Sequence, residues 1–237
     1  MNRVSRKAEA LPLRVGFFDS GVGGLCILRA FRKVCPGIAT EYVADSEHCP
    51  YGNRSPDEIR KLSEAIVGKL LKRGCRMIVV ACNTATAAAI DYLRVKYPEV
   101  PFVGLEPAIK PAAQRSKTGV VGVLATAGTF NGRLYNETKA KFAKNTTVLA
   151  VVADEFVEAV EKMHAGKVSL AELEPVVRRR IEPLLKAGCD KIVLGCTHFP
   201  HLKPLIEKVC GDRAEVLDPA PAVARQARRI LAERGWL

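Results

Sequence analysis

The chain has 237 residues, of which 48% are hydrophobic and 26% are charged, and its formal net charge is +12. These proportions are those of an ordinary globular protein, and they exclude a disordered, collagenous or low-complexity chain. The basic residues are spread along the whole sequence, and the densest cluster, at 178–180, falls in a helical pattern. A nucleic-acid partner is therefore not expected, although the positive charge would attract an anionic metabolite.

Export and membrane insertion are not expected either. Residues 1–13 are basic and mixed, without the apolar core of a signal peptide. No apolar run approaches the roughly 18 residues that a membrane span needs. The sequence therefore predicts a soluble, cytoplasmic protein whose eight cysteines are reduced thiols. No two of them form a CxxC pair and there is no HExxH motif, so a metal site is not expected.

Short β-branched apolar runs alternate with longer amphipathic segments along the chain, which is typical of βα units around parallel sheets. The clearest helix begins after Ser55, because Ser55 can cap it, Pro56 suits its first position and Glu58 completes a capping box. The expected strands are Val15–Phe18, Glu41–Ala44, Met77–Ala81, Phe102–Gly104, Val120–Leu124, Val148–Val152, Lys191–Leu194 and Glu215–Leu217.

An internal repeat is the most informative feature of the sequence. Residues 69–85 read KLLKRGCRMIVVACNTA and residues 183–199 read PLLKAGCDKIVLGCTHF, with eight identities in a gapless alignment. Each copy reads as a helix end, a glycine stop, a buried strand and a cysteine at the carboxyl end of that strand. A weaker echo pairs VGFFDSG at 15–21 with VGVLATA at 121–127.

The repeat predicts an α/β fold of two pseudo-symmetric lobes with mostly parallel sheets that face each other across a cleft. The first lobe is expected to comprise residues 1–105, completed by 214–237, and the second lobe residues 106–213. The segment between Pro98 and Pro111 is the expected crossover.

The two repeat-related thiols at the strand ends are Cys82 and Cys196. Ligands of open α/β sheets bind at the carboxyl ends of the strands, so facing lobes would place one thiol on each side of a ligand. A helix is expected after each thiol, with Thr84 and Thr197 as caps, and its free N–H groups would favour the thiolate. Inverting a stereocentre needs a base on one face and an acid on the other, and the reverse reaction exchanges these roles. Two equivalent thiols therefore favour a racemase.

Other interpretations of these thiols and loops remain. Taken singly, either cysteine could be a buried structural thiol, and the equivalent pair Cys75 and Cys189 is expected to be structural. No role is assigned to Cys26, Cys35, Cys49 and Cys210. A two-lobed binding protein would not need two equivalent thiols. The loop at 21–24 resembles a dinucleotide fingerprint, but a cysteine replaces the third glycine of GxGxxG and no GK[ST] motif is present.

Five short motifs follow one another along the chain. They are FDSGVGGL at 18–25, PYGN at 50–53, ACNTA at 81–85, GLEP at 104–107 and GCTHFP at 195–200. In this order they resemble the motifs of the glutamate racemases, within the wider aspartate/glutamate racemase group. The resemblance runs from about Val15 to the C-terminus. Phe199 departs from it, because a tyrosine is more usual there, and this could change the shape of the pocket.

The resemblance implies two facing flavodoxin-like lobes, a homodimer, and a reaction without pyridoxal phosphate or metal. It implies that glutamate is held between the two thiols, with Cys196 taking the proton from L-glutamate and Cys82 from D-glutamate. Asp19 falls where the family has an acidic residue that assists the first thiol. His198 and Glu161 fall where it has assistants to the second. The product would supply D-glutamate for peptidoglycan.

The resemblance also implies a set of substrate-binding residues. From the residue pattern alone, Asp19 could instead cap the next helix and His198 could be a packed histidine. Glu161 could be a solvated surface residue, and Glu158 could be confused with it. Aspartate racemisation is the alternative activity, but Thr197-His198 favours glutamate, because aspartate racemases of this group typically carry an acidic residue in place of the histidine. The implied substrate-binding residues are Asp19, Ser20, Pro50, Tyr51, Gly52, Cys82, Asn83, Thr84, Cys196, Thr197 and His198.

Overall fold

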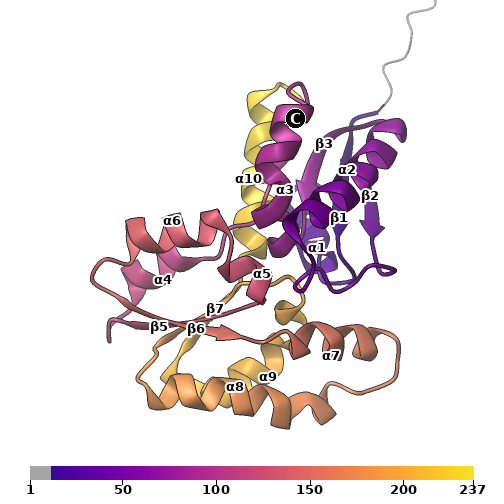
Figure 1. Cartoon of the computed structure of the whole chain (residues 1–237). Helices are drawn as coiled ribbons and strands as arrows, with labels where there is room; N and C mark the ends of the chain where they lie inside the picture. Colours follow the sequence, from indigo (N-terminus) through magenta and orange to yellow (C-terminus); the bar gives the residue numbers. More distant parts are fainter. Residues whose placement is uncertain (1–11) are drawn as a thin grey trace, which may run out of the picture.

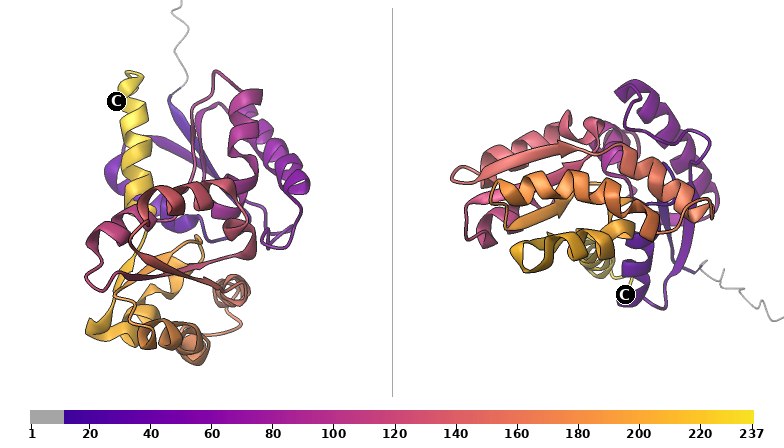
Figure 2. Two further views of the ribbon diagram at one scale, coloured as in Figure 1. Left: turned by 60° about the vertical axis from the view of Figure 1, so that its left-hand side comes forward. Right: turned by 90° about the horizontal axis from the view of Figure 1, so that it is seen from below.

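The computed structural model describes residues 12–237, and residues 1–11, which the expected first lobe includes, lie outside them. Within the described range the strands form two parallel sheets of four, in the orders β2-β1-β3-β4 and β6-β5-β7-β8. Figures 1 and 2 show the sheets in separate lobes. The strands are β1 (Arg14–Asp19), β2 (Ala39–Ala44), β3 (Cys75–Val80), β4 (Phe102–Val103), β5 (Val120–Ala125), β6 (Thr147–Val152), β7 (Lys191–Leu194) and β8 (Glu215–Leu217).

Helices connect the strands and pack on the sheets (Figure 1). The longest, α2, has 17 residues, fewer than the roughly 20 that span a bilayer. None of the helices in residues 12–237 has the length and apolar character to cross a membrane. The α-helices are α1 (Leu25–Val34), α2 (Pro56–Lys72), α3 (Asn83–Lys96), α4 (Ile109–Arg115), α5 (Ala127–Phe130), α6 (Arg133–Phe142), α7 (Glu155–His164), α8 (Glu174–Lys186), α9 (Lys203–Cys210) and α10 (Ala220–Glu233), and the 3-10 helices are η1 (Ala171–Leu173), η2 (Phe199–Leu202) and η3 (Gly211–Arg213).

The two lobes are pseudo-symmetric, as the sequence repeat predicts. Adding four to each strand number of the first sheet gives the order of the second. All of the expected strands are present, with small differences at their ends. The glycine stops of the repeat are also confirmed, because Gly74 and Gly188 have positive φ angles of 81° and 83°, which side chains on other residues disfavour. The predicted two-lobed α/β fold is therefore confirmed.

The repeat extends to the packing inside each lobe. Gly16 in β1 leaves space for core side chains from α2 and β3, and Gly122 in β5 leaves space for core side chains from α8 and β7. An added Cβ would lie 2.9 Å from the nearest core atom at Gly16 and 2.8 Å from the nearest at Gly122. The side chains that would be met are Leu70, Ile78 and Cys75 at the first glycine and Leu184 and Ile192 at the second. The leucine and isoleucine pairs are identities of the sequence repeat, so the two cores are built alike.

Helix α2 begins as its sequence predicts. The Ser55 hydroxyl accepts a hydrogen bond from the Glu58 backbone N–H at 3.2 Å, and Pro56 occupies the first position. The inner face of the helix carries Ile66 and Leu70, which are buried against the first sheet. A local cap and an apolar stripe therefore place this helix before the strand that ends at Cys82.

The C-terminal segment is divided between the lobes, which corrects the expected boundary. β8 pairs with β7 and Val216 joins the core of the second lobe, whereas 214–237 was expected to complete the first lobe. Helix α10 does pack on the first lobe, where it contacts α1 and buries Ala227 and Leu231. Figure 1 shows α10 in yellow beside the first lobe. The short apolar strand β8 therefore pairs with β7 in the second lobe, and the chain returns to the first lobe only in α10.

The densest basic cluster lies on the outer surface of α8. Arg178 pairs with Glu174 and Glu182, both at 2.9 Å, and Arg180 pairs with Glu155 at 2.5 Å. These ion pairs neutralise much of the local positive charge. The cluster therefore has the character of a solvated helix face.

Candidate active site

The two thiols that the repeat identifies lie at equivalent strand ends, one in each lobe. Cys82 follows β3 and Cys196 follows β7, and they are only 5% and 6% exposed. The loops that carry them meet, because Ser20 Oγ lies 3.8 Å from Cys82 Sγ and the neighbouring Asp19 accepts a hydrogen bond at 2.7 Å from Thr197, the residue after Cys196. The structure therefore brings together the pair that the sequence predicted.

The helix that follows Cys82 is capped by the cysteine itself. The Ala85 backbone N–H donates to Cys82 Sγ at 3.4 Å, and Ser20 Oγ lies 3.8 Å from the same sulfur. Thr84 was expected to be the cap, but it lies inside α3. Thr197 is not a cap either, since its hydroxyl bonds to Asp19. The thiol therefore takes the position at the helix N-terminus where an anion is favoured.

Burial dominates the acidity of both thiols. It raises the pKa of Cys82 to about 12, with a further rise from Asp19, and the Ala85 N–H offsets only part of this. Burial likewise raises the pKa of Cys196 well above its ordinary value. The backbone N–H groups do favour each thiolate, as expected, but desolvation outweighs them in this closed structure and the net pKa is raised. A positive group placed beside either sulfur would favour ionisation.

Asp19 is a fully buried carboxylate that joins the lobes. The Gly21 N–H donates to its Oδ1 at 2.6 Å, and the Thr197 hydroxyl from the second lobe donates to its Oδ2 at 2.7 Å. Burial raises the pKa of Asp19, although these hydrogen bonds oppose the rise. Helix α1 has no side-chain cap, so Asp19 does not fill that alternative role.

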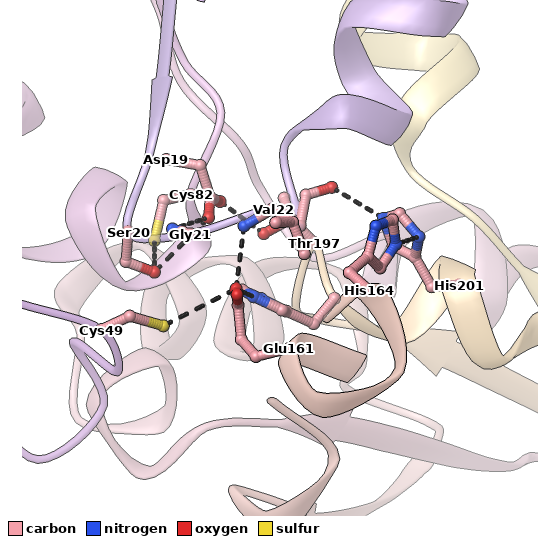
Figure 3. A network of polar contacts seen from close by, with 12 residues as sticks. Asp19, Ser20, Gly21, Val22, Cys49, Cys82, Glu161, His164, Thr197 and His201 are labelled. Atoms are coloured by element: carbon pink, nitrogen blue, oxygen red, sulfur yellow. Dashed lines mark hydrogen bonds and ion pairs between the residues drawn. The ribbon is translucent and has the colours of Figure 1, made fainter. Parts of the chain in front are cut away.

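A chain of polar contacts leads away from the second thiol. His198 Nδ1 lies 3.9 Å from Cys196 Sγ, and Nε2 lies 2.7 Å from Glu161 Oε1. Glu161 also accepts from the Val22 N–H at 2.8 Å, which Figure 3 shows as a contact between lobes. Burial would raise the pKa of Glu161, but hydrogen bonds from His198 and Val22 lower it overall. Glu158, the residue that could be confused with Glu161, is exposed on the same helix.

The loop after β2 supplies the PYGN motif. Tyr51 is buried in the same core cluster as Cys82, and its hydroxyl donates to Asp45 Oδ2 at 2.5 Å. Gly52 faces the second lobe, because an added Cβ would lie 3.1 Å from Asp154 Oδ1. Pro50 is exposed. This loop therefore contacts both lobes.

Asn83 carries an unpaired amide beside Cys82. Its side chain is only 2% exposed, and neither Oδ1 nor Nδ2 has a hydrogen-bond partner among residues 12–237. A buried amide without partners costs free energy, so this arrangement is typical of a ligand-binding group. The amide N–H₂ can donate to a carboxylate, and the carbonyl oxygen can accept from an ammonium group.

Two residues at the site were not predicted. Thr126 follows β5, is buried, and its Oγ1 lies 2.9 Å from Thr84 Oγ1 in the first lobe. The weaker sequence echo could have indicated Thr126, because this residue aligns there with Ser20. Cys49 is the second, and it lies 3.8 Å from Glu161 Oε1 (Figure 3). Nothing in the sequence pattern relates Cys49 to the second lobe.

The lobes are closed over the thiols. An added Cβ at Gly23 would lie 2.5 Å from His198 Nδ1, so the loop after β1 touches the opposite lobe directly. Because both thiols are buried beneath these contacts, a substrate reaches them only when the lobes separate. The polar contacts between the lobes in residues 12–237 include Asp19–Thr197, Val22–Glu161, Thr84–Thr126, Cys26–Thr197, Gly23–His201, Cys49–Glu161 and Asp91–Arg133.

Comparison with known proteins identifies the family. Residues 26–227 match the family model of Asp/Glu/hydantoin racemases. The chain is 49% identical over 218 residues to the glutamate racemase of Herpetosiphon aurantiacus, covering 92% of this chain and 84% of that protein. It is 45% identical over 223 residues to the glutamate racemase of Roseiflexus sp., covering 94% and 81%. The chain therefore belongs to the Asp/Glu/hydantoin racemase family.

A solved structure supports the same assignment. The crystal structure of Escherichia coli glutamate racemase in complex with L-glutamate and the activator UDP-MurNAc-Ala matches with a TM-score of 0.84 at 37% identity. The match covers 93% of this chain and 83% of that one. Within the family, the resemblance to glutamate racemases that the five motifs predict is confirmed.

Proposed function

We propose that this protein is a glutamate racemase that interconverts L- and D-glutamate by moving the α-proton between Cys82 and Cys196. The observation that carries the proposal is the pair of buried, repeat-related thiols, one from each lobe. Family membership makes the protein an isomerase of the racemase type. Its similarity to glutamate racemases over more than nine-tenths of the chain supports glutamate as the substrate.

Each thiol acts once in a turnover. Cys196, as a thiolate, removes the α-proton of L-glutamate and becomes a thiol, and the electron pair stays on the α-carbon. The Cys82 thiol then delivers its proton to the opposite face, which leaves D-glutamate and an ionised Cys82. With D-glutamate the two roles exchange. The substrate ammonium group supplies the positive charge that favours a thiolate in this buried site.

Polar neighbours assist the two thiols. His198 contacts Cys196, and Glu161 holds the His198 ring through its Nε2. Asp19 stands on the Cys82 side, where its charge raises the pKa of that thiol, so it favours the protonated form that donates to the substrate. These contacts support the roles that the family resemblance implies.

The substrate contacts that we propose surround the thiols. The unpaired amide of Asn83 supports a contact to the substrate carboxylate or ammonium group. Thr126 joins the hydroxyl groups that line the site from the second lobe. The remaining proposed contacts come from Ser20, Pro50, Tyr51, Gly52, Thr84, Thr197 and His198.

We propose that the protein acts in the cytoplasm as a homodimer, without pyridoxal phosphate or a metal, and supplies D-glutamate for peptidoglycan. The similarity to glutamate racemases supports the supply of D-glutamate. Sedimentation of the purified full chain tests the dimer, and a single species with the mass of one chain would contradict it.

The test of function follows optical activity by circular dichroism. The purified protein receives L-glutamate, D-glutamate or L-aspartate without added cofactor, beside the Cys82→Ser and Cys196→Ser variants. We expect loss of optical signal from both glutamate enantiomers and near-complete loss of activity in each variant, while a Cys35→Ser control at a distant buried thiol stays active. Turnover of aspartate alone would overturn the substrate.

Isotope exchange tests the two-thiol mechanism itself. In D₂O, the first D-glutamate formed from L-glutamate should carry deuterium at the α-carbon, while the remaining L-glutamate should stay unlabelled. This outcome follows because one thiol removes the proton and another, already exchanged with solvent, delivers deuterium. Early deuterium in the recovered L-glutamate would instead indicate one base that serves both faces.

A further inference from the structure

Cys49 lies beside the polar chain that serves Cys196. Its sulfur is 3.8 Å from Glu161 Oε1, and the same oxygen is 2.7 Å from His198 Nε2. One ligand atom from each of these three residues lies within 4.8 Å of the other two. Cys49 and Glu161 are half-buried, whereas His198 is buried, so the cluster is reached from its thiol and carboxylate side.

The cluster fits a tetrahedral cation with soft character. Zinc binds thiolate sulfur at about 2.3 Å and imidazole nitrogen or carboxylate oxygen at about 2.0–2.2 Å, which places neighbouring ligand atoms about 3.3–3.8 Å apart. The separation of the Cys49 sulfur from Glu161 already lies at the upper end of that range. The separation of His198 from Glu161 must widen, and rotation of the half-exposed glutamate side chain allows this.

We propose that Cys49, Glu161 and His198 form a binding site for a thiophilic divalent cation such as Zn²⁺ or Cd²⁺, and that its occupation inhibits the enzyme. The proposal goes beyond the racemase activity, because the cation is not part of that reaction. Three protein ligands leave a fourth position for water. The thiolate and imidazole ligands favour Zn²⁺ and Cd²⁺ over Mg²⁺ and Ca²⁺, which prefer oxygen ligands.

Occupation would change the surroundings of Cys196. In the free site His198 Nε2 donates its proton to Glu161. Coordination of Nε2 by the cation releases this proton to solvent and replaces the contact with Glu161, and the neutral, coordinated ring takes a proton from solvent on Nδ1, the atom 3.9 Å from Cys196 Sγ. Coordination of Cys49 releases its thiol proton to solvent. The cation also bridges the first lobe, through Cys49, and the second, through Glu161 and His198. Inhibition follows from both effects, because the assistant to Cys196 is lost and the lobes are held together.

Direct binding is measured first, with Cd²⁺ as the probe. Full-length, reduced protein is titrated with Cd²⁺, and the thiolate-to-cadmium absorption band and the heat of binding are followed. The measurement is made in a Cys82→Ser/Cys196→Ser background, so that the two thiols proposed for catalysis cannot bind the cation. We expect saturable binding in this background that weakens at least about tenfold when Cys49→Ser is added. A matched Cys26→Ser change, at the other half-buried thiol, should leave the affinity unaltered.

Inhibition is measured second, with Zn²⁺ on the enzyme that retains both thiols. With each protein measured against its own rate without metal, the Cys49→Ser variant should require at least about tenfold more Zn²⁺ for half-inhibition. Mg²⁺ should not inhibit either protein. Unchanged Cd²⁺ affinity after Cys49→Ser would overturn the proposal, as would equal Zn²⁺ inhibition of the two proteins. The binding measurement needs no turnover, so a failure of the racemase assignment would be seen separately.

Discussion

Replacing Gly122 with alanine adds a methyl group where the core of the second lobe has no room. The new Cβ would lie 2.8 Å from Leu184 Cδ1 and 2.9 Å from Ile192 Cδ1, about 0.5 Å closer than ordinary van der Waals contact. Both side chains are buried, with exposures of 2% and 0%, so neither can move aside into solvent. The substitution therefore makes the ends of these two side chains shift within a filled core.

The magnitude follows from two opposing effects. Overpacking of a filled core costs about 1–3 kcal/mol. The change from glycine to alanine also stabilises the folded state by about 0.4–1 kcal/mol, because it reduces the conformational entropy of the unfolded chain. The net effect is a loss of about 1–2 kcal/mol of unfolding free energy, and a fall in Tm of roughly 2–8 °C for a chain of this length. Gly16→Ala should give a similar loss, since its Cβ would lie 2.9 Å from Ile78 Cδ1 in the first lobe.

Urea denaturation and thermal melting followed by far-ultraviolet circular dichroism measure the loss. Gly68→Ala is the matched control, because this helical glycine has no atom within 4 Å of an added Cβ. That change should stabilise the protein by about 0.5–1 kcal/mol through helix propensity. If Gly122→Ala stabilised the protein as the control does, the packing argument would be refuted, and with it the structural reason given for the repeat identities.

Three further predictions concern charge and acidity. Asp190 is 14% exposed, and hydrogen bonds from Ser116 and nearby backbone N–H groups outweigh burial and hold its pKa at about 2. Asp190→Asn should therefore lower the free energy of unfolding, measured by urea denaturation at neutral pH, by about 2 kcal/mol. This loss should shrink as pH falls from near 4 towards 2, and a loss that stays constant would contradict the linkage between the pKa and stability. Glu161→Gln should lower kcat about tenfold or more without unfolding the protein, because it weakens the hold on His198, and an unaltered kcat would exclude that role. Because burial raises the pKa of Cys82 to about 12, kcat/KM for D-glutamate should rise from about pH 6 to about pH 9, whereas a fall over this range would show that the thiolate is not the base.

The chain order of strands and helices could be predicted because it depends on local patterns. Apolar runs and amphipathic segments locate every strand of residues 12–237, and Ser55 and Glu58 locate the start of α2. The pairing of Cys82 with Cys196 could also be predicted, since two copies of one unit place equivalent residues at equivalent strand ends. Thr126 could have been found in the same way, from its alignment with Ser20.

Other features depend on contacts between segments that are far apart in the sequence. The partner of β8 is decided by which sheet edge is free when the chain reaches Glu215, and no local pattern records it. Cys49 meets Glu161 only because the lobes close on each other. The acidity of Cys82 is likewise a tertiary property, since removal of water from its sulfur outweighs the helix N–H group that the local sequence supplies. The sequence by itself determined the elements and the two thiols, because periodicity and repetition are local. Only the tertiary structure decided burial and the contacts across the cleft, because solvation and electrostatics depend on every segment that surrounds a group.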